Sequence, residues 1–175
     1  DVNGELSGDL SKPIPNSLLS KVKEIGWLSR FKQNKKAVQK QIILAIVSGP
    51  EPQKTILSAR LKSLLAQLEE ESILYMGCPG INQNQEIGNL TVKGHASTNE
   101  FAQDLANAKI VIGRSGYSSL MDYKILNKKM ILIPTPGQDE QVYLGEYLSV
   151  NSEVTLISQK DLNFTNLKSA IIDAC

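Results

Sequence analysis

The chain has 175 residues, and its 19 Lys and Arg side chains nearly balance 18 Asp and Glu side chains, giving a net charge of +1. A chain of this length can bury enough apolar surface to fold without a metal or a disulfide framework. This charge balance provides no overall field that would attract nucleic acid or an anionic membrane, so we expect neither as a direct partner. The longest apolar runs are far shorter than the roughly 20 residues that span a bilayer. The two cysteines are too few for a disulfide framework, so we expect a soluble, cytoplasmic protein.

The first 20 residues are rich in Gly, Ser and Pro, as linkers often are. We therefore expect residues 1–20 to be a linker from a preceding domain and residues 21–175 to form one domain. Residues 22–31 are expected to form a strand and a loop that pack Trp27 and Phe31 onto the sheet as core anchors. The basic stretch at residues 30–40 lacks the aromatic side chains that stack bases, and is expected to be a solvated loop.

From residue 41 onward, short aliphatic runs alternate with segments of helical periodicity, which is typical of a parallel sheet covered by helices on both faces. The sequence therefore predicts an α/β, three-layer, Rossmann-like domain with a six-stranded parallel sheet. The expected strands are residues 42–47, 73–76, 90–92, 110–113, 130–133 and 154–157.

Helices are expected between these strands. One covers residues 55–70, and a second starts at Ser97, where Ser97 and Glu100 have the spacing of a capping box, and ends near residue 107. Three more are expected to begin near Ser118, near Glu140 and after Asp161. The Gly-rich and polar residues 77–89 are expected to form a loop.

The turn after the fourth expected strand, with the sequence RSGYSS at residues 114–119, could hold a phosphate at a helix N-terminus. Gly116 could adopt positive φ and let an anion approach, with the Ser118 and Ser119 hydroxyls nearby. The alternative is that one of these serines only caps the helix. Asp122 lies about one turn deeper, where a carboxylate could accept two hydrogen bonds from a ribose diol, or could simply be a favourable acid in a first helical turn.

Two other loops belong to the same predicted edge of the sheet. Residues 48–53 match neither the dinucleotide nor the Walker pattern, and Glu51 would repel phosphate if it pointed inward. The amides and carboxylates of residues 134–141 could bind sugar hydroxyls, although a plain helix-capping loop is the alternative. His95 is the single histidine, and no nucleophile, general base, metal-ligand cluster or cofactor motif stands out.

Together these segments resemble the C-terminal, donor-binding half of GT-B glycosyltransferases, most closely glycosyltransferase family 28. The resemblance covers residues 41–148, and its most specific part is IVIGRSGYSSLMD followed by ILIPTPGQDEQ. The segment IGWLSRF resembles the one by which such chains enter their second domain. The resemblance implies a domain that binds a nucleotide-diphosphate sugar, with a UDP-sugar expected, and no metal or cofactor.

The resemblance also implies a role for each matched position. Backbone groups of the 94–96 segment would recognise uracil, the 114–119 turn would hold the diphosphate, Asp122 the ribose, and the 138–141 segment the sugar. The donor-binding residues implied are Gly49, Gly94, His95, Ala96, Arg114, Ser115, Gly116, Tyr117, Ser118, Ser119, Asp122, Gln138, Glu140 and Gln141. Asp122 replaces a Glu of the family pattern, SGPEPQ replaces its Gly-rich first loop, and Leu144 and Gly145 replace its Asn-Ala.

In the family, an inverting displacement uses a general base from the N-terminal half, which could be fused to this chain or be a separate subunit. The resemblance therefore implies that this chain binds donor without transferring the sugar, with any membrane contact made through the other half. Two alternatives stay open at this point: a UDP-sugar epimerase or hydrolase of GT-B fold, and a noncatalytic nucleotide-binding interaction module.

Overall fold

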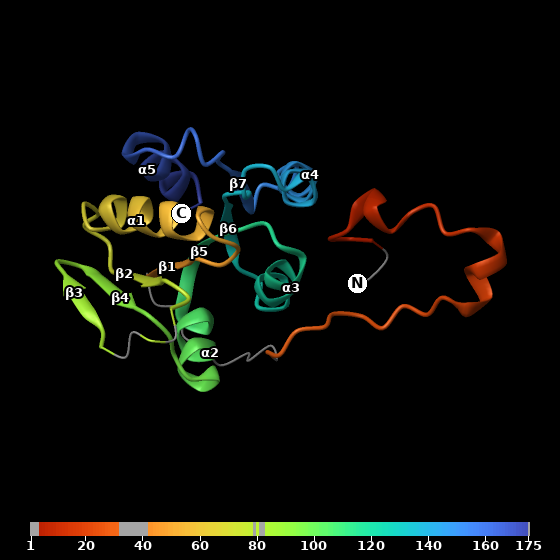
Figure 1. The fold of residues 1–175 in the computed structure, drawn as a ribbon, viewed down its shortest axis with the longest axis horizontal. Coiled ribbons are helices and arrows are strands. Elements are labelled where there is room, and N and C mark those ends of the chain that lie inside the picture. Colours follow the sequence, from red (N-terminus) through yellow and green to blue (C-terminus); the bar gives the residue numbers. More distant parts are fainter. Residues whose placement is uncertain (1–3, 32–41, 79, 81–82, 175) are drawn as a thin grey trace.

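The computed structural model describes residues 4–31, 42–78, 80 and 83–174 of the chain. It contains one seven-stranded sheet with the strand order β3-β4-β2-β1-β5-β6-β7 (Figure 1). The strands are β1 Ile42–Ile46, β2 Ser72–Tyr75, β3 Gln85–Ile87, β4 Leu90–Lys93, β5 Ala108–Gly113, β6 Lys129–Leu132 and β7 Val154–Leu156.

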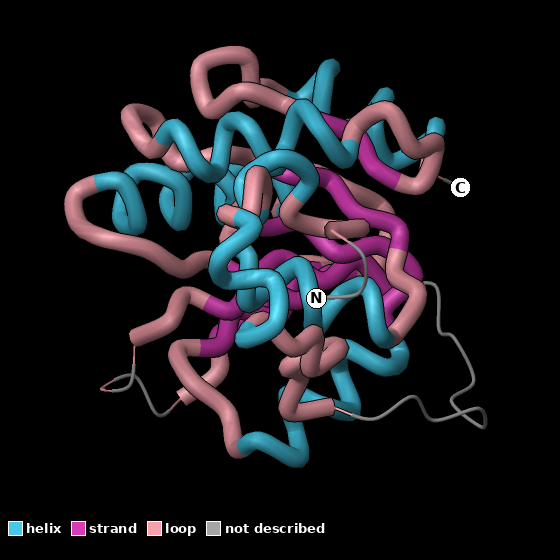
Figure 2. Tube along the Cα trace, turned by 90° about the vertical axis from the view of Figure 1, so that its right-hand side faces the viewer, coloured by secondary structure: helices cyan, strands magenta, loops and turns pink. Residues whose placement is uncertain are grey.

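Helices cover both faces of the sheet, which lies between them in Figure 2. One face is covered by α1 and α5, and the other by α2, α3 and α4. The helices are α1 Gln53–Leu65, α2 Thr98–Asn107, α3 Tyr117–Ile125, α4 Asp139–Leu148 and α5 Phe164–Asp173, preceded by two short 3-10 segments, η1 Gly8–Ser11 and η2 Asn16–Lys21. The expected helices are confirmed, except that the first ends earlier than predicted.

The period-2 alternation of side chains along the strands produces the two apolar layers of the core. In β1, Ile43 and Ala45 pack under α1 and α5, whereas Leu44 packs with the helices of the opposite face. β5 repeats the pattern, with Ile110 and Val111 on opposite faces. A central strand that is buried on both faces has the continuous aliphatic run that the sequence displays.

The prediction of a six-stranded, wholly parallel sheet is wrong by one strand. All six expected strands are present and mutually parallel, but β3 adds an antiparallel edge strand from the segment predicted to be a loop. Gln85 and Glu86 are exposed, so this strand has no apolar face that periodicity could reveal. The missed signal is the two-residue turn Gly88-Asn89, with Gly88 at φ 57°, which forms a tight hairpin with β4.

The prediction of a strand within residues 22–31 is wrong, because none forms there, but Trp27 and Phe31 do pack into the core. The centre of the Phe31 ring lies 5.8 Å from that of Phe101 in α2. Further upstream, Leu6 is fully buried and the Asp9 N–H donates to the Tyr143 hydroxyl of α4 at 2.7 Å. Most of the basic loop predicted at residues 30–40 lies outside the described residues, which resume at residue 42.

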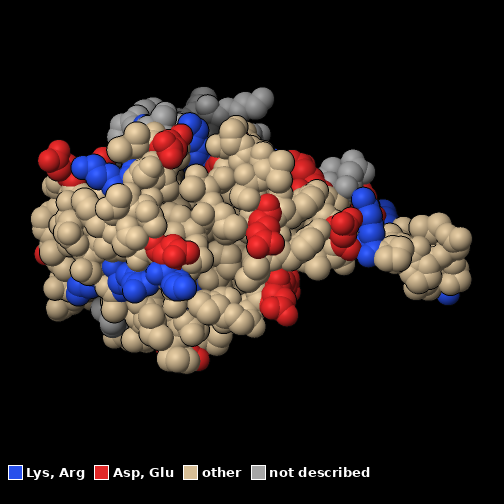
Figure 3. All heavy atoms as spheres, turned by 90° about the horizontal axis from the view of Figure 1, so that it is seen from above, with Lys and Arg blue, Asp and Glu red and all other residues tan. Residues whose placement is uncertain are grey.

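On the face seen in Figure 3, Lys and Arg side chains lie beside Asp and Glu rather than in a patch of one sign. None of the helices in the described ranges combines the length and apolar character needed to cross a membrane.

Candidate functional site

The parallel strands bring four polar loops to one edge of the sheet, because each loop follows the carboxyl end of β1, β4, β5 or β6. Two cavities of about 350 Å³ each lie at this edge. The first, here called the α3–α4 pocket, is lined by Gly116, Gln138, Asp139, Glu140 and Gln141. The second, the β4–α2 pocket, is lined by Arg30, Ile46, Val47, Tyr75, Gly77, Gly94, His95, Ala96, Ser97, Thr98 and Phe101.

Gly116 is the N-cap of α3, and no side chain caps this helix. The alternative that Ser118 or Ser119 caps it is therefore wrong, and so is the expected positive φ, since Gly116 has φ −73° and ψ 135°. A Cβ at Gly116 would meet nothing within 4 Å. Neither backbone strain nor packing therefore requires glycine here, and the missing side chain leaves the first turn of α3 open to the α3–α4 pocket.

The amides of the β6–α4 loop are linked to one another. The Gln141 side chain accepts a hydrogen bond from the Thr135 N–H at 2.9 Å, and its Nε2 donates to Gln138 Oε1. The Gln138 NH2 group has two N–H donors that can serve a ligand, and Gln138 Oε1 keeps a second lone pair beside the one that accepts from Gln141. The Ser115 hydroxyl donates to the Gln141 carbonyl at 2.6 Å and so ties the β5–α3 loop to α4.

Arg114 is enclosed in the domain and is only 2% exposed. Its guanidinium donates to the carbonyls of Ile133 at 3.1 Å, Pro134 at 3.0 Å and Gln53 at 3.1 Å. Burial lowers the pKa of Arg114 to about 10. Arg114 and Ser115 are predicted to bind substrate, but both side chains are buried, do not line the pocket, and connect neighbouring segments of the chain.

In the β4–α2 pocket, the predicted residues Gly94, His95 and Ala96 lie together, as the uracil hypothesis requires. Sequence reasoning missed Arg30, whose guanidinium carbon lies 5.0 Å from the ring centre of Phe31 and 5.3 Å from that of Phe101. The signal was present, since Arg30 belongs to the segment IGWLSRF that carries part of the resemblance.

Asp122 lines neither of the two pockets and is 9% exposed. One carboxylate oxygen accepts from the Ser29 hydroxyl at 2.6 Å, and the other lies 3.4 Å from Arg30 Nε. In this structure Asp122 therefore holds the N-terminal segment, and it adjoins the β4–α2 pocket only through Arg30.

The remaining predicted positions surround the site without lining these two pockets. Ser118 is exposed and Ser119 is half-buried, whereas Tyr117 borders a larger hollow between α4 and the N-terminal segment. Gly49 has φ 108°, which favours glycine, and the Thr135 hydroxyl lies 3.8 Å from where a Cβ would be. Glu51, a possible repeller of phosphate, instead accepts from the Thr55 N–H of α1 at 3.1 Å.

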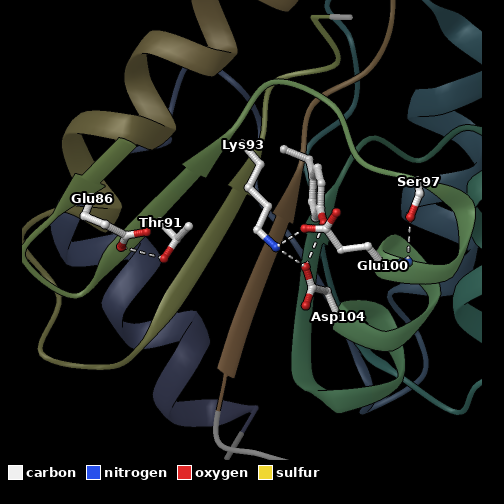
Figure 4. A network of polar contacts seen from close by, with 7 residues as sticks. Glu86, Thr91, Lys93, Ser97, Glu100 and Asp104 are labelled. Atoms are coloured by element: carbon white, nitrogen blue, oxygen red, sulfur yellow. Dashed lines mark hydrogen bonds and ion pairs between the residues drawn. The ribbon is translucent and has the colours of Figure 1, made fainter. Parts of the chain in front are cut away.

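A polar network supports the loop before α2 (Figure 4). Lys93 Nζ lies 2.8 Å from the Glu100 carboxylate and 2.7 Å from that of Asp104, which also accepts from the Tyr75 hydroxyl at 2.7 Å. Ser97 does cap α2, since its hydroxyl accepts from the Glu100 N–H at 3.2 Å, but the Glu100 carboxylate binds Lys93 instead of completing the capping box. The network fixes the ends of the 94–97 loop.

This network predicts that the free energy of unfolding falls as the pH rises above about 10. Burial and the Asp104 hydrogen bond raise the pKa of Tyr75 above 10.0. Burial lowers the pKa of Lys93, but the hydrogen bonds to Asp104 and Glu100 outweigh the effect of burial, so the pKa of Lys93 lies above 10.5. A raised folded-state pKa gives stability that is complete below the unfolded pKa and is lost as pH rises. Urea unfolding between pH 8 and about 11 should show a shallower fall for Tyr75→Phe, and parallel curves would contradict this assignment.

Among residues 4–31, 42–78, 80 and 83–174, no group of His, Cys, Asp and Glu side chains could hold a metal ion.

The architecture defines an α/β, Rossmann-like domain with a mostly parallel sheet, in which the loops after the parallel strands gather at one edge. A family model described as Glycosyl transferase family 1 matches residues 41–173. The chain belongs to this family of glycosyltransferases, and its resemblance to a GT-B domain of the family 28 type is confirmed.

Curated relatives are consistent with this family assignment. The protein named UDP-N-acetylglucosamine--N-acetylmuramyl-(pentapeptide) pyrophosphoryl-undecaprenol N-acetylglucosamine transferase, from Clostridium perfringens, is 30% identical over 179 residues. That match includes 99% of this chain and 47% of the relative, so the chain spans about half the length of the curated relatives it matches.

Solved structures of the same fold include MurG from Acinetobacter baumannii, with a TM-score of 0.58 and 19% identity, covering 78% of this chain and 46% of that one. The solution structure of ALG13 has a TM-score of 0.53 and 17% identity, and here 75% of this chain matches 85% of the other. The fold is thus found both as half of a longer chain and as a chain of similar size.

Proposed function

We propose that this chain is the donor-binding half of a glycosyltransferase and binds a nucleotide-diphosphate sugar, with UDP as the nucleotide. The diphosphate lies at the N-terminus of α3, the sugar in the α3–α4 pocket and the uracil against residues 94–96 in the β4–α2 pocket. The observation that carries this proposal is the side-chain-free N-cap at Gly116, because an uncapped helix start beside an open pocket offers backbone donors and a favourable dipole to an anion.

An inverting transfer needs the departing diphosphate to be stabilised and the acceptor hydroxyl to be deprotonated. The start of α3 can supply the first of these functions as negative charge develops on the leaving group. We propose that the second, together with the acceptor site and any membrane contact, belongs to an N-terminal domain that is fused or separate. Glycosyl transfer by the pure 175-residue chain alone would contradict this division. We also propose a cytoplasmic location, which the free thiol of Cys78 supports.

Calorimetric titration with UDP tests the proposal, and Asp122→Ala tests its ribose contact. We expect UDP to bind the wild-type chain, and the variant to bind it more weakly by about 1–3 kcal/mol, because a charged hydrogen-bond acceptor is lost. Absence of binding at millimolar UDP would favour an interaction module instead. Release of free UDP from a UDP-sugar without acceptor would favour a hydrolase or epimerase.

Ser29→Ala is the control for the Asp122 measurement, since Ser29 contacts the same carboxylate from the N-terminal segment. A loss of affinity confined to Asp122→Ala excludes an effect through Ser29 and assigns the loss either to contact with ribose or to the release of Arg30, the other partner of the carboxylate. Equal losses in the two variants would show that Asp122 acts by holding the N-terminal segment, and an unchanged affinity would remove Asp122 from the site.

A further inference from the structure

The N-terminal segment is held to the body of the domain at two places. Residues 4–11 lie against α4, and the contact is close, because a Cβ at Gly8 would lie 2.5 Å from the Tyr143 hydroxyl. Residues 27–31 return to the body, and the aromatic side chains at both ends of this stretch pack into the core. The residues between these two anchors, 12–26, are here called the arm, and they run as a loop outside the helices and the sheet (Figure 1).

The arm exposes apolar side chains to water. None of residues 12–26 is buried, and η2, which lies within the arm, buries no residue. Leu19 is 53% exposed and Ile25 is 65% exposed. The exposed large apolar side chains of the arm are Leu18, Leu19, Val22 and Ile25. Because so little burial offsets the entropy lost on ordering this loop, the arm is expected to be covered by another molecule.

The arm also forms one wall of the hollow that Tyr117 borders, which has a volume of about 1050 Å³. Its apolar lining comes mainly from the N-terminal segment, and its charges have both signs. The charged lining residues are Lys12, Lys23 and Glu24 on the arm and Asp139 and Glu140 on α4. An apolar surface with a polar rim is typical of a contact between proteins. An anionic membrane would instead face three carboxylates.

The hollow lies beside the proposed donor site. It shares Asp139 and Glu140 with the α3–α4 pocket, and Tyr117 directly follows the Gly116 N-cap. In the proposed function the general base comes from another domain and must approach the acceptor to within about 3 Å. That domain must therefore stand next to the starts of α3 and α4, where the hollow opens. The chain spans 47% of the curated relatives it matches, so they carry a further segment of similar length.

From this arrangement we infer that the arm and the hollow form the docking surface for the acceptor-binding domain. That domain inserts apolar side chains into the hollow and covers Leu18 and Leu19 of the arm. The inference rests on the proposed function and specifies where its partner binds. A second copy of this chain and an anionic membrane are the other occupants that an experiment has to separate.

Hydrogen exchange compares the isolated 175-residue chain with the complete enzyme that contains both halves. In the isolated chain, the amides of residues 16–26 should exchange about as fast as those of an unfolded chain, because the arm buries no side chain. In the complete enzyme they should exchange slower by about tenfold or more, while β1 and β5 keep their rates. Equal exchange of the arm in both samples would overturn the inference.

Two further samples test the other occupants. If the arm of the isolated chain becomes protected as its concentration is raised, a second copy covers it and the inference is overturned. The same holds for a membrane if vesicles of phosphatidylglycerol protect the arm without the other half. Exchange that stays fast in both samples supports a specific partner domain.

The double variant Leu18→Asp and Leu19→Asp should remove the protection of the arm in the complete enzyme, because two charges would enter the contact. Ile172→Asp is the matched control, since Ile172 is 61% exposed but lies on α5, which covers the opposite face of the sheet. It should leave the protection unchanged. Protection that persists in the folded double variant would contradict the proposed docking surface, and thermal unfolding verifies that each variant is folded.

Titration with UDP separates this inference from the function on which it rests. The isolated double variant should bind UDP as tightly as the wild-type chain, because neither leucine lines the α3–α4 or the β4–α2 pocket. If UDP does not bind the wild-type chain, the proposed function fails. If UDP binds but the arm stays unprotected in the complete enzyme, only the docking inference is overturned.

Discussion

Replacing Gly116 with Asp is expected to weaken UDP binding at least a hundredfold while leaving the stability of the domain nearly unchanged. Asp is a favoured N-cap residue and Gly116 already has an extended conformation with open space at its Cβ position, so the fold should accept the side chain. The new carboxylate would stand where the diphosphate is proposed to bind. At about 4 Å and an effective dielectric constant near 20, two unit charges repel by about 4 kcal/mol.

Gly116→Asn is the matched control, because Asn has the shape of Asp and caps helices equally well, but carries no charge. Its UDP affinity should lie between those of the wild type and Gly116→Asp. Urea unfolding of the apo variants should give free energies within about 1 kcal/mol of the wild type. Full UDP affinity in folded Gly116→Asp would exclude the start of α3 as the phosphate site.

Replacing Arg114 with Met is expected to lower the free energy of unfolding by about 3 kcal/mol. The side chain donates to one carbonyl at the start of α1 and to two in the β6–α4 loop, and Met would fill similar space but remove these three hydrogen bonds. Hydrogen bonds to charged groups contribute about 1.5–3 kcal/mol each, and the desolvation cost of the buried guanidinium offsets part of the sum.

Arg60→Met supplies the comparison, since Arg60 is exposed and its guanidinium donates a hydrogen bond to the Gln159 carbonyl at 2.5 Å. Its loss should cost about 1 kcal/mol in the same urea series. If the two variants were equally stable, the connection of loops through Arg114 would contribute little to the fold.

The layers of the domain could be predicted from sequence because its central strands are buried on both faces. Runs such as residues 42–47 and 110–113 are continuously aliphatic, and each is followed by a helix with a recognisable start. The edge strand β3 escaped prediction, because an exposed polar strand has no apolar period and is specified mainly by its Gly88-Asn89 turn.

The candidate site could be predicted in part. The sequence order places Gly116 and residues 138–141 in loops after β5 and β6, and parallel pairing brings those loops together. The contacts of Asp122 could not be predicted, because its partner Ser29 lies 93 positions away in a segment with no regular structure. The role of Arg114 could not be predicted either, because the local sequence is the same whether its side chain is buried against carbonyls or exposed to a phosphate.

The strand order also determines where a crevice can open. The chain passes from β1 to β2 on one side and returns to β5 on the other, and α1 and α3, which follow the adjacent strands β1 and β5, cover opposite faces. These two helices start at a common edge of the sheet, so the backbone alone places the β1–α1 and β5–α3 loops beside each other. Evolution can therefore exchange the residues of these loops while the scaffold stays the same.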